Sequence, residues 1–493
     1  MSFKHWRRRG TLVVAGLAVT AIAVPGLSAA SAAKVPGPAL KLEAAQNSIT
    51  VNSFRGRVGF DPGIWLAALG SPLEFDVQRA AYTKPVTLTQ IIHPPYGGVI
   101  HRPLPPRLLD KWFGLKRFAT LTMRNSAGKV VLTQRATFCP NFFPARVTPG
   151  SPPSSPYPSQ CGFNPFTVSQ VWGVQKDWAS EPVGFVSAKL PLGVYTATLT
   201  ISSEYTRLFN IAATDATATV KVTVVKPPKC CPEPGCCPPG ARHPSHRMGL
   251  GQRPPAVRTL TNPPAASLPD LVALPAWQVR TRHQKQGNVD LLAFSASVWI
   301  GGNSQLDVEG FRSNGSPVMK AYQYFWRNGH VIGRARAGTM GFDSKKGHDH
   351  WHFEQFARYT LLNSHKSLVV LSHKVGFCIA PVDPINLLIP HALWKPVLTG
   401  FFGNCGSPSA MWVTEQLPIG WDDTYQQDIA GQAFDITHVP NGTYYIQVTA
   451  NPEKVLYETT TSNDVSFRKV ILGGTPGHRT VKVPAWHGID PEP

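Results

Sequence analysis

Apolar and polar residues alternate along much of the first half of the chain. The stretches with a period of two are NSITVNSF, FATLTMRN, KVVLTQRATF, GVYTATLTIS and ATATVKVTVV. Side chains of a β-strand point to opposite faces in turn, so this period predicts strands with one buried face. NSAGK and LPLG supply the turns between them. We therefore expect a β-sandwich domain over residues 33–225.

The same kind of pattern returns after residue 268. It is carried by VDLLAFSASVWIGG, LDVEGFRS, KAYQYFWRNG, HFEQFARYTLL, SLVVLSHKVGFCI, AFDITHVP and TYYIQVTA. A glycine-rich phosphate loop and a regular alternation of strand and helix are both missing, which argues against an α/β fold. We predict a second β-rich domain over 268–473, followed by a C-terminal tail, 474–493.

Residues 226–267 are dense in proline and glycine and are predicted to be a linker. The predicted fold class is thus all-β, with two β-sandwich-like domains joined by a Pro/Cys-rich linker. The composition agrees, because 47 prolines, 42 glycines and only 15% charged residues favour short strands joined by turns. The length of 493 residues is also sufficient for two domains.

The N-terminus is predicted to be a secretory signal peptide, 1–32. A basic front of Lys4 and three arginines precedes an apolar run and the small residues ASAA. A retained membrane anchor is the alternative, but the run is short and contains Pro25. We expect a secreted or extracytoplasmic protein that can be associated with the cell surface.

Export allows disulfides, and the eight cysteines are consistent with this. Cys139 with Cys161, and Cys378 with Cys405, are expected to pair because each pair lies within one predicted domain. The other four cysteines form CCPEPGCC in the linker. This cluster is interpreted as a disulfide-linked spacer or as a site for a soft metal such as Cu(I).

The net charge of +20 is unevenly distributed. Residues 34–267 carry 25 Lys and Arg against 10 Asp and Glu, a net +15, whereas residues 268–473 carry 17 against 16, a net +1. A basic region outside the cell suits an anionic cell-wall polymer or a membrane surface, or it is simply a solvated face. We expect no nucleic-acid partner.

Three histidines stand at every second position in GHDHWHF: His348, His350 and His352. On a helix they would diverge, but on a strand residues i, i+2 and i+4 share one face. Three neutral imidazoles suit Cu(II) or Zn(II) and leave positions open for water or substrate. The spacing by itself does not separate copper from zinc, or a metal site from exposed histidines.

The residues around this triplet resemble the lysyl oxidase family of copper amine oxidases, in order, from 268 to 473. HDHWHFEQFARYTLL is similar to the family's copper strand, and SHKVGFC to the segment that carries the cofactor lysine, here Lys374. GWDDTYQQDIAGQAFDITHVPNGTYYIQVTANP is similar to the segment of the quinone tyrosine, here Tyr425. The chain is thereby identified as a secreted, prokaryotic-type relative in its C-terminal half only.

The resemblance implies copper at the three histidines and a lysine tyrosylquinone built from Lys374 and Tyr425. It implies oxidation of primary amines, peptidyl lysine among them, by molecular oxygen, with release of aldehyde, ammonia and hydrogen peroxide. The candidates for the general base that removes the α-proton of the bound amine are Asp422, Asp423, Asp428 and His373.

LPDL and ETTTSNDV resemble the start and the end of the family's domain, where some members hold calcium. The expected ligands here are Asp270, the Leu271 carbonyl, Glu458, Asn463 and Asp464, because oxygen donors of this kind suit Ca²⁺. Thr460 stands where those members carry an acid, so solvated loop acids are the alternative.

The chain also departs from the family. Residues 381–404, PVDPINLLIPHALWKPVLTGFFGN, form an insert without a counterpart, and 34–225 match nothing in the family. Trp421 and Asp422 stand where the animal segment has Cys and Tyr. Two other functions therefore stay open: a non-enzymatic, wall-associated binding protein with a structural metal at the histidines, and a metal-handling protein that uses CCPEPGCC and the histidines.

Overall fold

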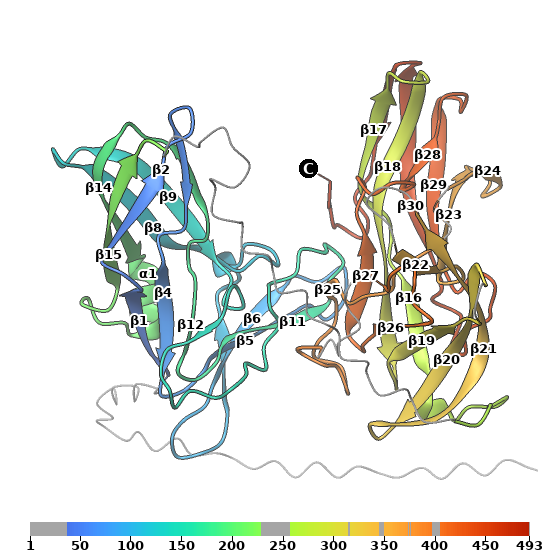
Figure 1. Ribbon diagram of the computed structural model, residues 1–493, viewed down its shortest axis with the longest axis horizontal. Helices are drawn as coiled ribbons and strands as arrows, with labels where there is room; N and C mark the ends of the chain where they lie inside the picture. Colours follow the sequence, from blue (N-terminus) through green and yellow to red (C-terminus); the bar gives the residue numbers. More distant parts are fainter. Residues whose placement is uncertain are drawn as a thin grey trace, which may run out of the picture. The chain divides into compact units, whose positions relative to one another are not determined.

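The computed structural model describes residues 37–227, 257–313, 316–344, 350–372, 374, 376–396 and 405–492. The predicted signal peptide, CCPEPGCC, His348 and His373 lie outside the described residues. Within them the structure is almost entirely β, which confirms the predicted fold class (Figure 1). No helix in this described part is long and apolar enough to cross a membrane.

The N-terminal region is built around a five-stranded sheet of order β2-β15-β14-β8-β9. Its strands are β2 (Ser48–Asn52), β8 (Leu115–Asn125), β9 (Val130–Phe138), β14 (Gly193–Ile201) and β15 (Thr217–Val225). They coincide with the five stretches of period two. In β14 and β15 the buried positions alternate with exposed ones, as that period requires.

Three smaller sheets complete this region, and the alternation of polar and apolar residues did not predict them. One has the order β1-β4-β12-β10, with β1 (Ala39–Ala44), β4 (Ile64–Leu69), β10 (Ala145–Arg146) and β12 (Trp178–Ser180). The second has the order β11-β5-β6-β7, with β5 (Leu73–Gln78), β6 (Thr87–Ile92), β7 (Ile100–Leu104) and β11 (Ser169–Val174). The third pairs β3 (Arg57–Phe60) with β13 (Val186–Lys189). Several of these strands are buried on both faces, so their sequences do not alternate.

A short helix, α1 (Ser203–Phe209), lies between β14 and β15 and was not expected. Glu204 stands in its first turn, and Asn210 closes it in the left-handed conformation with φ 54°. Tyr205 packs into the core and its hydroxyl donates to the Lys116 carbonyl at 2.9 Å. A seven-residue helix is too short to show a clear period in sequence. The remaining helical turns are 3-10 segments, Pro106–Leu108 and Ala265–Ser267.

The C-terminal region contains three sheets around one core. One is a six-stranded sheet with the path β16-β18-β27-β25, on which β17 and β28 also pair with β18. Its strands are β16 (Pro269–Ala273), β17 (Trp277–Gln284), β18 (Val289–Gly302), β25 (Asp383–Pro384), β27 (Trp421–Tyr425) and β28 (Ala433–Asp435). β27 is buried along its whole length, between β18 and β25.

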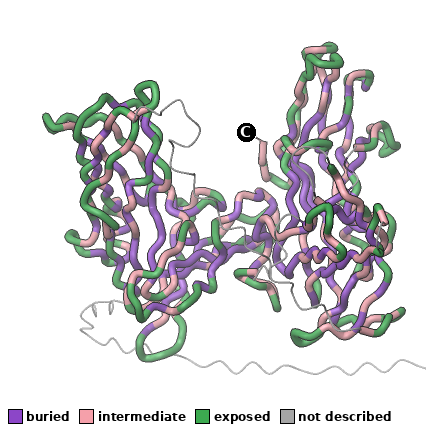
Figure 2. The backbone as a smooth tube through the Cα atoms, viewed as in Figure 1, coloured by how far each residue is buried: buried purple, intermediate pink, exposed green. Residues whose placement is uncertain are grey.

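The other two sheets have five strands each. The first, β22-β21-β20-β19-β26, contains β19 (Leu306–Phe311), β20 (Val318–Arg327), β21 (His330–Asp343), β22 (His350–Phe353) and β26 (Trp412–Leu417). The second, β24-β23-β29-β30-β31, contains β23 (Ala357–Asn363), β24 (Leu368–Leu371), β29 (Gly442–Ala450), β30 (Val465–Thr475) and β31 (His478–Lys482). β30 continues past residue 473 and the predicted tail adds β31 to the sheet. Figure 2 shows the buried positions along these strands.

Two predicted strands end earlier than expected. HFEQFARYTLL is divided between β22 and β23 by a turn at residues 354–356. SLVVLSHKVGFCI is a strand only as far as Leu371, the end of β24. In both cases the chain leaves one sheet for another, and an apolar run does not reveal such a change.

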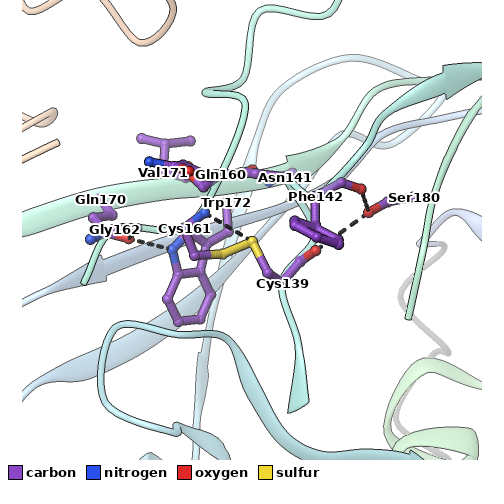
Figure 3. Close-up of a disulfide and its surroundings, with 11 residues drawn as sticks. Cys139, Asn141, Phe142, Gln160, Cys161, Gly162, Gln170, Val171, Trp172 and Ser180 are labelled. Carbon is purple, nitrogen blue, oxygen red and sulfur yellow. Dashed lines mark hydrogen bonds between the residues drawn. A yellow bond between two sulfur atoms is a disulfide. The ribbon is translucent and has the colours of Figure 1, made fainter. Parts of the chain in front are cut away.

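Both expected disulfides are present, Cys139–Cys161 and Cys378–Cys405. Around the first (Figure 3), Gln170 accepts hydrogen bonds from the Gly162 backbone N–H at 3.2 Å and from the Trp172 ring N–H at 2.7 Å. Ser180 donates to the Phe142 carbonyl at 2.6 Å. This disulfide therefore lies in a hydrogen-bonded setting directly before the segment 163–169.

The segment 163–169 contacts the insert of the C-terminal region. The backbone N–H groups of Val168 and Ser169 donate to the Ile385 carbonyl, at 2.7 and 3.0 Å, and Leu387 N–H donates back to Ser169 at 3.2 Å. Phe166 packs in a small core with Leu274, Trp277 and Ile385. The two regions thus share a buried junction, to which the described part of the insert, 381–396, contributes Ile385 and Leu387.

Candidate active site

Two of the three histidines of the HxHxH run lie on β22. Pairing with β21 places His352 opposite Gly341 and His350 opposite Asp343. The two imidazoles are on the same face, with their Nε2 atoms 2.8 Å apart. His352 is buried and His350 is half-buried. The two rings therefore converge at the start of β22.

The segment that carries Lys374 lies directly beside this strand. Phe353 and Phe377 exchange two backbone hydrogen bonds, of 2.8 and 3.0 Å. Between Lys374 and Phe377 stands Gly376, where a Cβ atom would lie 2.7 Å from the Cβ of His352. Only glycine allows the backbone to pass the histidine this closely. The pairing thus brings the lysine segment against the histidines.

Tyr425, the last residue of β27, completes the arrangement. Its hydroxyl accepts a hydrogen bond of 2.6 Å from the Cys378 backbone N–H. The Lys374 Nζ atom lies 4.5 Å from the centre of the Tyr425 ring, and the Phe377 ring meets the tyrosine edge-on at 5.0 Å. Lys374 and Tyr425 are both buried, with 6% and 8% of their surfaces exposed. Lysine and tyrosine, distant in sequence, are neighbours in the fold.

Two buried carboxyl groups lie on the same side as the tyrosine. Burial, the neighbouring Asp422 and Glu415 raise the pKa of Asp423 well above its usual range, while the Lys374 charge lowers it. Burial raises the pKa of Glu415, which accepts a 3.0 Å hydrogen bond from Ile379 N–H. Burial and these carboxylates also raise the pKa of the Tyr425 hydroxyl. The neutral, protonated tyrosine is therefore the resting form.

The geometry distinguishes between the candidates for the general base. Asp423 shares a strand face with Tyr425 and acts electrostatically on Lys374. Asp422 points to the opposite face of β27 and accepts a hydrogen bond from Asn164. Asp428 is exposed to solvent beyond the end of β27. Among the candidates that the structure describes, Asp423 is the one placed beside the lysine.

A cavity of about 700 Å³ opens next to the histidine and the lysine. His352 and Lys374 line it, together with the carboxylates of Asp343, Glu354 and Asp435. Glu354 accepts a 2.6 Å hydrogen bond from Thr339, and Asp435 accepts one of the same length from Thr437. The cavity lining therefore combines three carboxyl groups with His352 and Lys374.

The expected calcium ligands lie near one another at the end of β16. Asn463 donates to Asp270 at 2.9 Å, and Leu271 N–H donates to Glu458 at 3.2 Å. Ala273 N–H donates to the Asn463 carbonyl. The Leu271 carbonyl lies between the Leu271 and Ala273 N–H groups on the same edge of β16, so it faces the same loop. One side-chain oxygen each of Asp270, Asn463 and Asp464 is buried without a hydrogen-bond partner.

No group of three or more His, Cys, Asp or Glu side chains that could hold a metal occurs within the described ranges, which exclude His348. At the calcium candidate, three of the five expected donors are carboxylates, and they are not close enough to form such a group. The unpartnered oxygens nevertheless fit an oxygen-ligated cation, since buried acceptors are otherwise nearly always hydrogen-bonded. The metal roles stay predictions at both places.

Several residues of the site were not expected from sequence. Glu415, Phe377 and Cys378 contact the tyrosine or its neighbours through tertiary pairing, and no local pattern marks them. Asn164, which lies in the N-terminal region outside the resemblance, reaches β27 and was also missed.

Part of the C-terminal region is similar in sequence to known proteins. The lysyl oxidase family model matches residues 408–478, which include β27 and Tyr425. The chain is 31% identical to lysyl oxidase homolog 4 of Bos taurus over 141 residues, which are 28% of this chain and 17% of that protein. It is 33% identical to lysyl oxidase homolog 4 of Homo sapiens over 133 residues, 27% of this chain and 16% of that protein. Lysyl oxidase homolog 2 of Gallus gallus is 31% identical over 139 residues, 28% of this chain and 16% of that protein.

The C-terminal region is thus similar to the lysyl oxidases, as its motifs predicted. The chain spans about a sixth of the length of these curated relatives. The similarity identifies a lysyl oxidase-like region on an all-β fold.

Proposed function

We propose that the protein is a secreted, copper-dependent amine oxidase whose quinone cofactor is built from Lys374 and Tyr425. The observation that supports it most directly is the 4.5 Å between the lysine Nζ and the tyrosine ring, in a buried site beside His352. Burial disfavours the charged form of a lysine and so favours its neutral, nucleophilic amine. A neutral amine beside the tyrosine ring suits a covalent reaction between the two side chains.

Copper fits the histidines of β22. His350 and His352 present two ring nitrogens to one point, and His348 would supply a third from the preceding residues. Neutral imidazoles are good ligands for Cu(II). The metal would supply oxidation of the tyrosine ring by molecular oxygen, and the mature quinone an electrophilic carbonyl for the amine. The backbone at Gly376 passes close against His352 and limits the space in which its ring can turn.

The protein's own residues would position and deprotonate the reacting groups. Phe377 holds the Tyr425 ring edge-on, and the Cys378 N–H fixes its oxygen. Asp423 is the carboxylate placed to take a proton from the Lys374 ammonium, and its raised pKa makes it a strong acceptor once it is ionised. The buried surroundings shield most of the Lys374 and Tyr425 surfaces from bulk water, and Lys374 reaches the cavity.

The substrate is proposed to be a primary amine borne on a peptide, such as a lysine side chain. The cavity carboxylates Asp343, Glu354 and Asp435 complement a cationic amine. Next to the cavity, β24 is an edge strand with Leu368 and Leu371 exposed by 57% and 52%. Ser372, which follows it, donates to the carbonyl of Gly431 in the cavity wall.

The edge of β24 is suited to an extended peptide. Ser372 N–H donates inward to Tyr359, so the alternation of the ladder turns the Leu371 N–H outward. A peptide could add there as a further strand and place a lysine side chain in the cavity. Leu371→Glu should then raise KM for a lysine peptide and leave KM for a small amine unchanged. An equal rise for both amines would contradict this docking mode.

We also propose calcium at Asp270, Leu271, Glu458, Asn463 and Asp464, supported by the unpartnered oxygens there.

A further proposal concerns the anionic cell-wall or membrane partner. The β8–β9 hairpin exposes five basic residues and contains no acid; they are Lys116, Arg117, Arg124, Lys129 and Arg135. Arg124→Glu with Arg135→Glu, in the full chain, should weaken binding to anionic vesicles. Binding that ignores both charge and salt would contradict an electrostatic contact.

Peptide mass spectrometry of the exported protein, produced with and without copper, tests the main proposal. A cross-linked peptide pair containing Lys374 and Tyr425, with a quinone absorption band, is expected only with copper. The His348→Ala, His350→Ala, His352→Ala variant should lose both the copper and the cross-link. One bound metal without a cross-link or peroxide production would instead support a binding protein with a structural metal.

A further inference from the structure

The strand that carries Tyr425 is held on its other side by the N-terminal region. Side chains of β27 alternate, so Asp423 and Tyr425 face Lys374 while Asp422 and Thr424 face the junction. Asn164, fully buried, donates from its Nδ2 to the Asp422 carboxylate at 2.8 Å. Its second Nδ2 hydrogen reaches Ser297 on β18 at 2.9 Å. One amide therefore bridges β18 and β27.

The orientation of this amide is fixed by its own backbone. The Asn164 Oδ1 atom accepts a hydrogen bond of 2.9 Å from Phe166 N–H, so Nδ2 must point to β27. Asp422 also accepts hydrogen bonds from Thr424 Oγ1 and Asp383 N–H, at 2.9 and 3.0 Å. Ser297 and Thr424 close the ring of contacts at 2.7 Å. Both carboxylate oxygens of Asp422 therefore have hydrogen-bond donors.

Backbone hydrogen bonds restrain β27 weakly along its edge with β25. β25, its partner there, is only two residues long, pairing at Asp383 with Asp422 and at Pro384 with Trp421. A strand that slips by one residue exchanges its two faces, which would turn Tyr425 away from Lys374. The side-chain network through Asn164 adds further anchoring points at the middle of the strand.

We propose that Asn164 is a positioning residue for the quinone site: through Asp422 it holds β27 in register, so that the N-terminal region is part of the machinery that places Tyr425 against Lys374. The proposal rests on the proposed function for its consequence in catalysis, but not for the anchoring itself. It assigns the N-terminal region a role inside the oxidase, in addition to any surface that it binds.

The junction offers a matched control residue, Ser169. Its hydroxyl also makes two hydrogen bonds across the junction, to Asn386 at 2.6 Å and from Leu388 N–H at 3.0 Å. Ser169 is buried like Asn164, but its contacts end on the insert and do not reach β27. Asn164→Ala and Ser169→Ala therefore both remove two buried junction contacts, and only the first touches the tyrosine strand.

Hydrogen exchange of the copper-free full chain tests the anchoring. In Asn164→Ala, exchange of a peptide that covers residues 421–425 should rise about tenfold, because the buried Asp422 carboxylate loses one of its three donors. In Ser169→Ala, exchange should rise in residues 385–389 and stay at the wild-type level in 421–425. Unchanged exchange of β27 in Asn164→Ala would overturn the proposal.

Quinone yield per bound copper tests the consequence. It should fall about tenfold in Asn164→Ala and stay near the wild-type value in Ser169→Ala, with copper bound by both. Full quinone in Asn164→Ala, or an equal loss in Ser169→Ala, would overturn the role in positioning. If the wild-type protein forms no quinone, the proposed function fails, while the exchange experiment still decides the anchoring.

A swap variant covers the case in which Asn164→Ala does not fold. Asn164→Asp with Asp422→Asn reverses donor and acceptor, and the carboxylate introduced at position 164 would still accept from Phe166 N–H. The double variant should recover exchange protection and quinone yield beyond either single variant. A double variant no better than Asp422→Asn alone would contradict a direct contact between the two side chains.

Discussion

The two faces of β27 carry similar residues but make different contacts. On one face Asp422 and Thr424 accept and donate within a closed hydrogen-bond network that ends on Asn164. On the other face Asp423 and Tyr425 meet a lysine, and one oxygen of Asp423 has no hydrogen-bond partner. The hydrogen-bonded Asp422 carboxylate of the first face suits an anchor, and the Asp423 carboxylate beside the lysine suits the proposed reactive site.

The comparison also explains the departures from the lysyl oxidase pattern. The reactive face keeps the residues that resemble the family, Asp423 and Tyr425. The anchoring face carries Asp422, where the animal segment has Tyr, and Asp422 bonds to the N-terminal region. The insert lies at the same junction. The unmatched region, the insert and the altered residue therefore meet at one junction.

The largest expected effect comes from the reactive face. Tyr425→Phe removes the oxygen that must become a quinone carbonyl and keeps the ring shape. Amine oxidation and the cross-link should vanish, while copper binding persists. Thr424→Val, one residue away on the other face, should keep measurable activity. Amine-dependent peroxide from Tyr425→Phe would contradict the cofactor assignment.

Asp423→Asn should have the next largest effect. The amide keeps the shape but accepts no proton, so the copper-dependent appearance of the quinone should slow by about a hundredfold. Stopped-flow absorbance after adding copper to the apoprotein gives this rate, and copper stoichiometry is the control. An unchanged rate would move the proton acceptor to His373 or Asp428.

The anchoring face should respond to pH. Burial raises the pKa of Asp422 to about 7, and burial with the Asp422 charge raises that of Asp383 well above its usual range. Both folded-state values lie above the unfolded ones, so their stabilisation is present below pH of about 4 and is lost as pH rises through about 7.

The free energy of unfolding of the wild-type protein should fall from acidic to alkaline pH. In Asp383→Asn this fall should be smaller by about 1–3 kcal/mol. Urea unfolding at both pH values measures it. Glu453→Gln, at an exposed carboxylate, is the control and should leave the pH dependence as it is. A parallel pH dependence in wild type and Asp383→Asn would show that the pair does not titrate in this range.

The smallest effect is expected far from β27, at the calcium candidate. Excess calcium should raise Tm by about 5 °C over chelator, because a ligand that binds only the folded state stabilises it. Asp270→Asn should abolish this rise without changing the Tm in chelator by more than about 2 °C. A Tm that is indifferent to calcium would assign the buried oxygens to hydrogen bonds with water instead.

Much of the β structure was predictable from sequence, because alternation is a local property of a strand. The five stretches of period two in the N-terminal region are all strands, and both disulfides pair as their positions implied. The family motifs by themselves also assigned Lys374 and Tyr425 to one site. Strands buried on both faces, such as β4 and β11, were not predicted because their sequences do not alternate.

Tertiary structure decided which distant residues meet. The sequence alone left the general base open among four residues, and the pairing of β27 between β18 and β25 turns Asp423 toward the lysine and Asp422 away from it. It also brings Asn164 to Asp422, a contact that spans two regions and has no local signal. Periodicity reports which face of a strand is buried. Only the register between strands determines what that face touches.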